Sequence, residues 1–412
     1  MKQRILDNSS NPIELEKLYR ENKSEFTKSL FELPADTDSE LLEFWKIRLT
    51  PETESKSFDM TDLLLVMIFS LFSGLLVKLP ELFSQIKSDD FYTRDLAIIV
   101  FNGVIMYTFW KNKVYNSSRI LIYGGIITAL LLFVNLLPYS KSDSVELAFI
   151  HTPLFLWCLF GLVYTGFSFR NTAGRIEFIR FNGEFLIMTG LILIAGGALT
   201  GITLGLFSAI KMNIERFYLE YVVVIGAVAA PIVSFYLIRL YPNLTSKVAP
   251  VIARVFTPLV LLTLAVYLVS LIFSQSKILE DRDLLILFNI MLLVVMAIIV
   301  FSVSELDKSK VKDFNVLVLL LLAVLAIIIN AIALTAIITR LTYGLTPNRT
   351  VVLVSNILIF VNLILISKSL FQSYFKGQEL QQVELTVAKY LNVYAIWTVI
   401  VIFLLPFLFN FR

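Results

Sequence analysis

Two arginines bracket a turn-forming segment, Arg340 to Arg349 (RLTYGLTPNR), that joins two long apolar runs. Its Tyr-Gly and Pro-Asn dipeptides favour turns, and it contains no acidic residue. Arg349 stands at the predicted start of the next helix, where the helix dipole disfavours a cation. We therefore predict that Arg349, with Arg340, Tyr343 and Thr346, contacts an anionic lipid headgroup or solute. For Arg340 the alternative is structural, because a cation suits the carbonyl end of the preceding helix.

A second charged segment, 175–184 (RIEFIRFNGE), alternates charged residues with aromatic and aliphatic ones. This pattern is typical of a connection lying at a membrane surface, with its apolar side chains dipping into lipid. We predict that Arg175 and Arg180 meet lipid phosphates there. The acids of this segment, Glu177 and Glu184, do not form a recognised catalytic pair.

Polar side chains inside the apolar runs are mostly asparagines. Asn330, Asn356 and Asn362 come from consecutive runs, so they can meet inside a helix bundle. An asparagine in lipid seeks a hydrogen-bond partner, and its usual role is to join helices. Two interpretations remain open, an interhelical hydrogen-bond network and a polar substrate pocket.

Three glycines, Gly197, Gly201 and Gly205, recur every four residues and lie on one helix face. Small residues at this spacing let helix backbones approach closely in a membrane. We predict that this face is buried against protein within the bundle. A dimer interface and a sliding gate are the alternatives.

Several kinds of chemistry are excluded by what the sequence lacks. It has no G-x-x-x-x-G-K-[ST] phosphate loop, no H-E-x-x-H and no G-x-S-x-G. One histidine, His151, and one cysteine, Cys158, cannot form a zinc site or a disulfide framework. We predict no cofactor, no metal and no enzymatic activity. The apolar runs contain almost no charge, which argues against a proton-coupled pump.

The elements that must position these residues are long apolar helices. The chain has 412 residues, of which 57% are hydrophobic and only 16% charged. Its net charge of +3 is too small to indicate nucleic acid as a partner. About twenty apolar residues cross a lipid bilayer, so the sequence predicts an all-α polytopic transmembrane helix bundle. We identify about eleven spans, at 62–79, 96–110, 120–138, 147–166, 186–210, 221–238, 256–274, 284–303, 315–339, 351–366 and 392–410.

The distribution of lysine and arginine predicts the orientation in the membrane. With the N-terminus inside, the five inner loops carry three basic residues each, and four of the five outer loops carry fewer. Basic residues are enriched in cytoplasmic loops. We predict a cytoplasmic N-terminus and an external C-terminus.

The region before the first span, residues 1–61, is predicted to be a separate cytoplasmic helical hairpin, with 62–412 forming the bundle. Asn11 and Pro12 have the form of a helix start, and this helix is expected to run to about Leu33. Asp38 is the expected cap of a second helix over 39–49. The hairpin either docks a protein partner or lies on the membrane with Trp45 at headgroup level.

The segment RLTYGLTPNRTVVLVSNILIFVNLIL (340–365) resembles bacterial membrane proteins of the domain-of-unknown-function family numbered 4153. The family's hallmark is Tyr-Gly-Leu-Thr-x-x-Arg, with another arginine three residues before the tyrosine. It matches here at Arg340, Tyr343, Gly344, Leu345, Thr346 and Arg349. Segments 175–184 and 247–268 are also similar, and the likeness covers most of residues 60–412. The resemblance implies a bacterial cytoplasmic (inner) membrane and says little about mechanism.

Two classes of function remain. One is a transporter, channel or other protein that handles a small solute or lipid, which we favour because eleven spans exceed what anchoring a tail requires. The other is a non-enzymatic envelope scaffold, sensor or regulator that binds a protein partner through its N-terminal region. The lipid bilayer is a partner in both.

Overall fold

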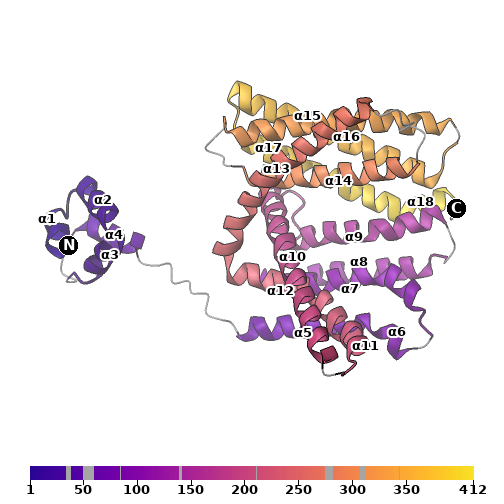
Figure 1. Cartoon of the computed structure of the whole chain (residues 1–412), viewed down its shortest axis with the longest axis horizontal. Coiled ribbons are helices and arrows are strands. Elements are labelled where there is room, and N and C mark those ends of the chain that lie inside the picture. Colours follow the sequence, from indigo (N-terminus) through magenta and orange to yellow (C-terminus); the bar gives the residue numbers. More distant parts are fainter. Residues whose placement is uncertain are drawn as a thin grey trace. The chain divides into compact units, whose positions relative to one another are not determined.

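The computed structural model describes residues 1–33, 39–49, 60–83, 85–138, 142–209, 211–273, 282–306, 312–342 and 344–412. The chain divides into two compact units, Met1–Thr61 and Asp62–Arg412. The regular elements within the described ranges are helices (Figure 1).

The N-terminal unit contains four short helices where the sequence predicted two. They are α1 (Lys2–Asp7), α2 (Pro12–Glu21), α3 (Lys23–Phe31) and α4 (Glu40–Leu49). The expected start at Asn11 is present, since its side chain accepts from the amides of Ile13 and Glu14. The first predicted helix breaks at Asn22, whose backbone is extended and whose side-chain oxygen accepts from the Glu25 amide. Asparagine stabilises a new helix start in this way, so α2 ends and α3 begins there. Asp38 lies outside the described residues.

These four helices bury a small core of their own. Trp45 is only 2% exposed, and its ring lies 5.2 Å from the rings of Tyr19 and Phe26. The alternative that placed Trp45 at the lipid headgroups is therefore wrong, because the residue fills the centre of this unit. The other buried apolar residues are Ile5, Leu15, Leu18, Phe26, Leu30, Leu33 and Leu42.

The second unit is a bundle of long apolar helices, as predicted. Nine helical stretches within the described residues are long and apolar enough to cross a membrane. Of the two remaining predicted spans, 96–110 lies in α7 and 284–303 lies in α14, so the number eleven stays a prediction. The helices are α5 (Met60–Val77), α6 (Leu79–Leu82), α7 (Ser88–Lys111), α8 (Ser117–Leu136), α9 (Asp143–Tyr164), α10 (Thr172–Ala209), α11 (Glu215–Phe217), η1 (Tyr218–Val223), α12 (Val224–Leu240), α13 (Pro242–Phe273), α14 (Arg282–Ser304), α15 (Phe314–Leu341), α16 (Pro347–Lys376), α17 (Gln381–Val399), η2 (Ile400–Leu404) and α18 (Leu405–Leu408).

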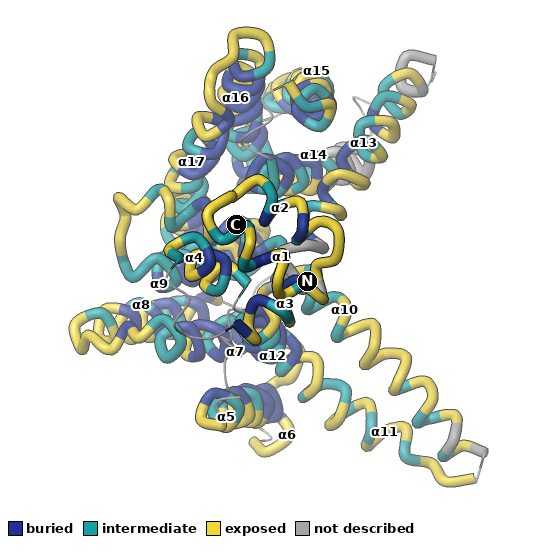
Figure 2. The backbone as a smooth tube through the Cα atoms, turned by 90° about the vertical axis from the view of Figure 1, so that its left-hand side faces the viewer, coloured by how far each residue is buried: buried dark blue, intermediate teal, exposed yellow. Residues whose placement is uncertain are grey.

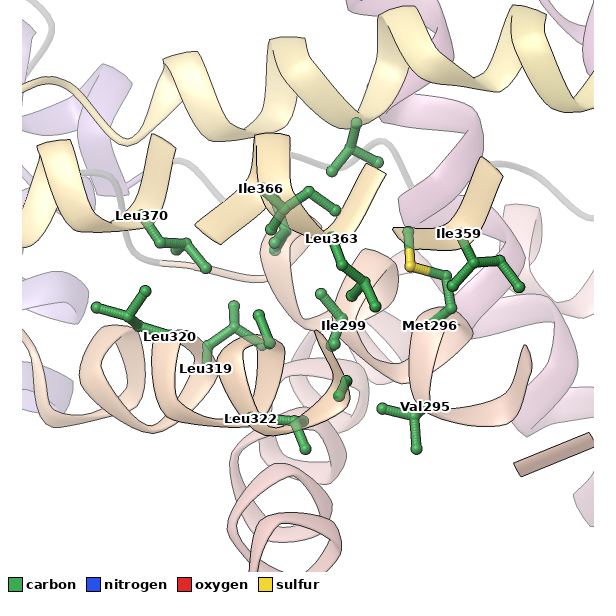
Figure 3. Packing of buried hydrophobic residues seen from close by; sticks show 14 of the residues in the cluster. Val295, Met296, Ile299, Leu319, Leu320, Leu322, Ile359, Leu363, Ile366 and Leu370 are labelled. Atoms are coloured by element: carbon green, nitrogen blue, oxygen red, sulfur yellow. The ribbon is translucent and has the colours of Figure 1, made fainter. Parts of the chain in front are cut away.

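Two hydrophobic cores organise this bundle. One lies mainly among α13, α14, α15 and α16, and the residues labelled in Figure 3 belong to α14, α15 and α16. The other lies among α5, α7, α8, α9 and α12. Helix α10 joins the two, because Ile179 belongs to the first core while Phe178 and Phe181 belong to the second. Figure 1 shows α10 running across the direction of α7, α8 and α9.

Contacts between helix ends fall into two groups. Arg94, before the second predicted span, donates to the carbonyls of Val134 and Leu137, which end the third. Lys111, after the second predicted span, pairs with Asp62 at the start of the first. Successive predicted spans cross the membrane in alternating directions. In both cases, this alternation places the two helix ends in contact on the same side of the membrane.

Two sequence predictions on α10 are corrected by the structure. Residues 175–184 are helical, since α10 begins at Thr172, just after the Asn171 side chain accepts from the Gly174 amide. The glycine face is exposed: a Cβ added at Gly197, Gly201 or Gly205 would meet no other atom within 4 Å in the described structure. Figure 2 shows the outer half of α10 extending away from the bundle. Spacing identifies a helix face but does not determine what covers it.

Candidate ligand cavity and charged cluster

A cavity of about 220 Å³ lies among α8, α9, α10 and α17. Its walls are mainly apolar and aromatic, and α9 contributes much of them through Phe155, Trp157 and Leu162. Cys158 lines the same space. The polar side chains at this cavity are Arg175, Asn392, Thr165 and Ser168.

Arg175 is held in place by acceptors from two other elements. Its Nη1 donates to the carbonyl of Ala388 at 2.8 Å and to Oδ1 of Asn392 at 2.9 Å, both on α17. Its Nη2 donates to the carbonyl of Phe169 at 2.8 Å. Its Nε is buried and donates to no acceptor within the described residues. A fixed cation with a spare donor therefore lies at one part of an otherwise apolar cavity.

Five residues further along α10, Arg180 lies in a group of charges. Its Nη2 is 3.4 Å from Oε1 of Glu384 on α17, and its Nε is 3.6 Å from Oε1 of Glu305, just after α14. Nε and Nη2 also donate to the carbonyl of Ser304, at 3.0 and 2.6 Å. The Glu305 and Glu384 side chains are only 7% and 3% exposed. With Glu184, which also acts electrostatically on Glu305, we call these residues the Arg180 cluster.

The two arginines share one helix pair. Glu384, Ala388 and Asn392 lie four residues apart along one face of α17. Arg180 on α10 binds Glu384. Arg175 on the same helix binds Ala388 and Asn392. Polar contacts between α10 and α17 thus occur both at the Arg180 cluster and at the cavity, and we call them the α10–α17 seam.

Residues 175–184 belong to α10 and are not the connection that the sequence predicted, whereas contact of Arg175 and Arg180 with lipid phosphates stays a prediction. Arg175 and Arg180 both bind protein acceptors, because the helix carries them into the contact with α17. Sequence reasoning missed Glu305 and Glu384 altogether. Each is an acid beside an apolar run, in a loop predicted to lie on the same side as Arg180. Their location on the same side of the membrane as Arg180 could have indicated these acids as partners, but it does not specify which loops contact each other.

The asparagines form interhelical hydrogen bonds. Asn330 Nδ2 donates to the carbonyl of Asn356 at 3.1 Å, and Asn356 Nδ2 donates to Oδ1 of Asn289 at 2.7 Å. Asn362 instead donates to the hydroxyl of Tyr394 at 3.0 Å. None of these residues lines the cavity described above. The geometry favours the joining role over the substrate pocket.

The segment between α15 and α16 satisfies much of its own polarity. Thr346 caps α16 by accepting from the Arg349 amide, and Arg349 Nη1 donates to the carbonyl of Gly344 at 2.8 Å. That carbonyl supplies negative partial charge to a cation at a helix start. Arg340 lies in the last turn of α15, at the carbonyl end of that helix, and Tyr343 lies outside the described residues. An anionic ligand at this turn stays a prediction.

Comparison with protein-family models, with curated proteins and with solved structures gives no match. Within the described residues, no group of three or more His, Cys, Asp or Glu side chains is arranged to hold a metal ion. Binding of a protein partner by residues 1–61 also stays a prediction.

Proposed function

We propose that the membrane unit binds and moves an amphipathic anion with a medium-length apolar tail, such as a fatty acid or a lipid. The observation that carries this proposal is the apolar cavity with Arg175 at its polar part. An anchor for a cytoplasmic tail would need neither feature.

The size and lining of the cavity support an apolar ligand part. One water needs roughly 10–15 Å³ of such volume, so about 220 Å³ holds many atoms. Apolar cavities of about 150 Å³ stay dry and take up apolar molecules. Aromatic walls with a few fixed polar groups are typical of small-molecule sites.

The charge at the cavity supports an anionic ligand part. Arg175 Nε has no acceptor among the described residues, and Asn392, Thr165 and Ser168 line the same cavity. Hydrogen bonds between a guanidinium and a carboxylate or phosphate are stronger than neutral ones. A ligand carrying its charge at one end satisfies both parts of the cavity.

Quenching of Trp157 fluorescence tests this proposal in purified protein. An ω-brominated medium-chain fatty acid should quench Trp157, which lines the cavity, and the quenching should disappear in Trp157→Phe. Ala395→Leu should weaken binding by filling the cavity, whereas Ala331→Leu at an exposed position on α15 should not. Quenching that is absent, or equal in both alanine variants, would refute the cavity as the site.

The requirement for an anionic ligand is tested by comparing the binding of an acid and an alcohol. Arg175→Gln should remove the preference for the brominated acid over the matching brominated alcohol, while Arg216→Gln, at an exposed arginine of α11, should keep it. An unchanged preference in Arg175→Gln would show that this arginine does not bind the anion.

We also propose a bacterial cytoplasmic membrane as the location, with the N-terminus inside. The loop charges and the resemblance of residues 340–349 to the family numbered 4153 support it. Membership in that family is likewise a proposal that rests on the motif. The Arg180 cluster then lies toward the cytoplasm.

A further inference from the structure

The Arg180 cluster holds more negative than positive charge. Helix α10 supplies Arg180 and Glu184, α17 supplies Glu384, and the end of α14 supplies Glu305. Two of these carboxylates lie beside the Arg180 guanidinium, and Glu184 acts electrostatically on Glu305. Like charges close to a partly buried carboxylate disfavour the ionised form of Glu305.

Glu305 is the member of the cluster whose ionised form is destabilised by its surroundings. Its Oε1 is buried and accepts no hydrogen bond from the described residues, although Arg180 Nε lies 3.6 Å away. A buried carboxylate oxygen without a donor is costly, and a proton removes both that cost and the repulsion from the other acids. Burial first, then Glu184 and Glu384, raises the pKa of Glu305 to about 7, while Arg180 opposes the shift.

A small cavity offers a route by which a proton can reach Glu305. Glu305 lines a second cavity of about 20 Å³ between α13, α14 and the start of α15. This volume admits about one water molecule. Its other charged side chains are Arg254 on α13 and Asp313 before α15, and Thr257 and Ser302 add hydroxyl groups. The cavity therefore has the polar partners that a bound water requires.

We propose that Glu305 is a proton-binding site that receives its proton through the small cavity. Protonation of Glu305 weakens its ion pair with Arg180, which lies at one end of the α10–α17 seam. In the loading step a hydronium ion gives its proton to a carboxylate oxygen and leaves as water. Arg180 then loses one anionic partner and keeps Glu384. The consequence for ligand binding rests on the proposed function, because it is transmitted along the seam to Arg175.

The proton site itself is tested without any ligand. Infrared difference spectra of the full-length protein between about pH 5 and pH 9 should show a protonated carboxyl band that titrates with a midpoint near 7. Glu305→Gln should remove this band, and Glu379→Gln, at an exposed acid of the loop before α17, should keep it. A band that survives in Glu305→Gln, or a midpoint near the ordinary glutamate value, would overturn the proposal.

A second variant keeps the test valid if Glu305→Gln does not fold. Glu384→Gln removes a neighbouring negative charge and should shift the Glu305 titration to lower pH. A titration that stays in place would show that these two carboxylates do not interact.

Coupling to the cavity is measured separately by the quenching assay at several pH values. Affinity for the brominated fatty acid should change between about pH 6 and pH 8 in wild type and should become constant in Glu305→Gln. Absence of binding at every pH would refute the proposed function and leave the infrared result standing. The same pH profile in both proteins would refute the coupling.

Discussion

Gly183→Ala on α10 places a methyl group against the ring of Phe301 on α14. A Cβ at this position would lie 1.9 Å from Phe301 Cε2 and 2.3 Å from Cδ2. Carbon atoms in contact normally stay about 3.5–4.0 Å apart, so the ring or the helix must move. Overpacking of this kind costs about 1–3 kcal/mol. The close approach of α10 to α14 therefore requires glycine at position 183.

Gly201→Ala on the same helix is the matched control. There the added Cβ meets nothing within 4 Å among the described residues. Both substitutions gain the same helix propensity, up to about 1 kcal/mol, so this contribution cancels in the comparison. The difference between the two variants is then the overpacking cost alone, about 1–3 kcal/mol.

Thermal unfolding in one detergent measures this difference. Gly183→Ala should melt several degrees below Gly201→Ala, at about 2–4 °C per kcal/mol. Adding Phe301→Ala should remove the penalty of Gly183→Ala, because it removes the ring that the methyl group meets. Equal melting temperatures for the two glycine variants, or no rescue, would refute the packing that we describe between α10 and α14.

Three further predictions concern orientation, the N-terminal unit and pH. In a Cys158→Ser background, Arg412→Cys should react with an impermeant maleimide outside intact cells and Glu25→Cys should not; the opposite pattern would invert the topology. Trp45→Ala should lower the free energy of unfolding of the N-terminal unit by about 3–5 kcal/mol. It should abolish the protection of amides 1–49 from hydrogen exchange in the full chain and leave protection in the bundle unchanged. Retained protection in residues 1–49 would contradict the core that we describe. Because Glu305 has a raised pKa, the folded state binds a proton that the unfolded state has released, so stability should fall as pH rises from about 4.5 to about 7. Melting curves should show this fall in wild type and a weaker one in Glu305→Gln, and identical slopes would contradict it.

The helical membrane architecture was predictable because its cause is local. A bilayer leaves backbone groups without water, so each crossing must be an apolar helix of sufficient length, and such runs are visible in the sequence. A turn before α16 was predictable for the same reason from its Tyr-Gly and Pro-Asn dipeptides, whereas the role of Thr346 as the cap of α16 was not predicted. The extra helix start at Asn22 was missed because a cap and a mid-helix asparagine look alike without the backbone conformation.

The site depended on contacts between residues distant in sequence. Arg180 binds the Ser304 carbonyl and Glu384, which lie 124 and 204 positions away, and no local pattern specifies either partner. The glycines show the same limit: the regular series Gly197, Gly201 and Gly205 meets nothing in the described chain, whereas the isolated Gly183 meets Phe301. Sequence determines which residues share a helix face, because helix geometry is fixed by the backbone. Only the tertiary structure decides what that face meets, because packing depends on every helix at once.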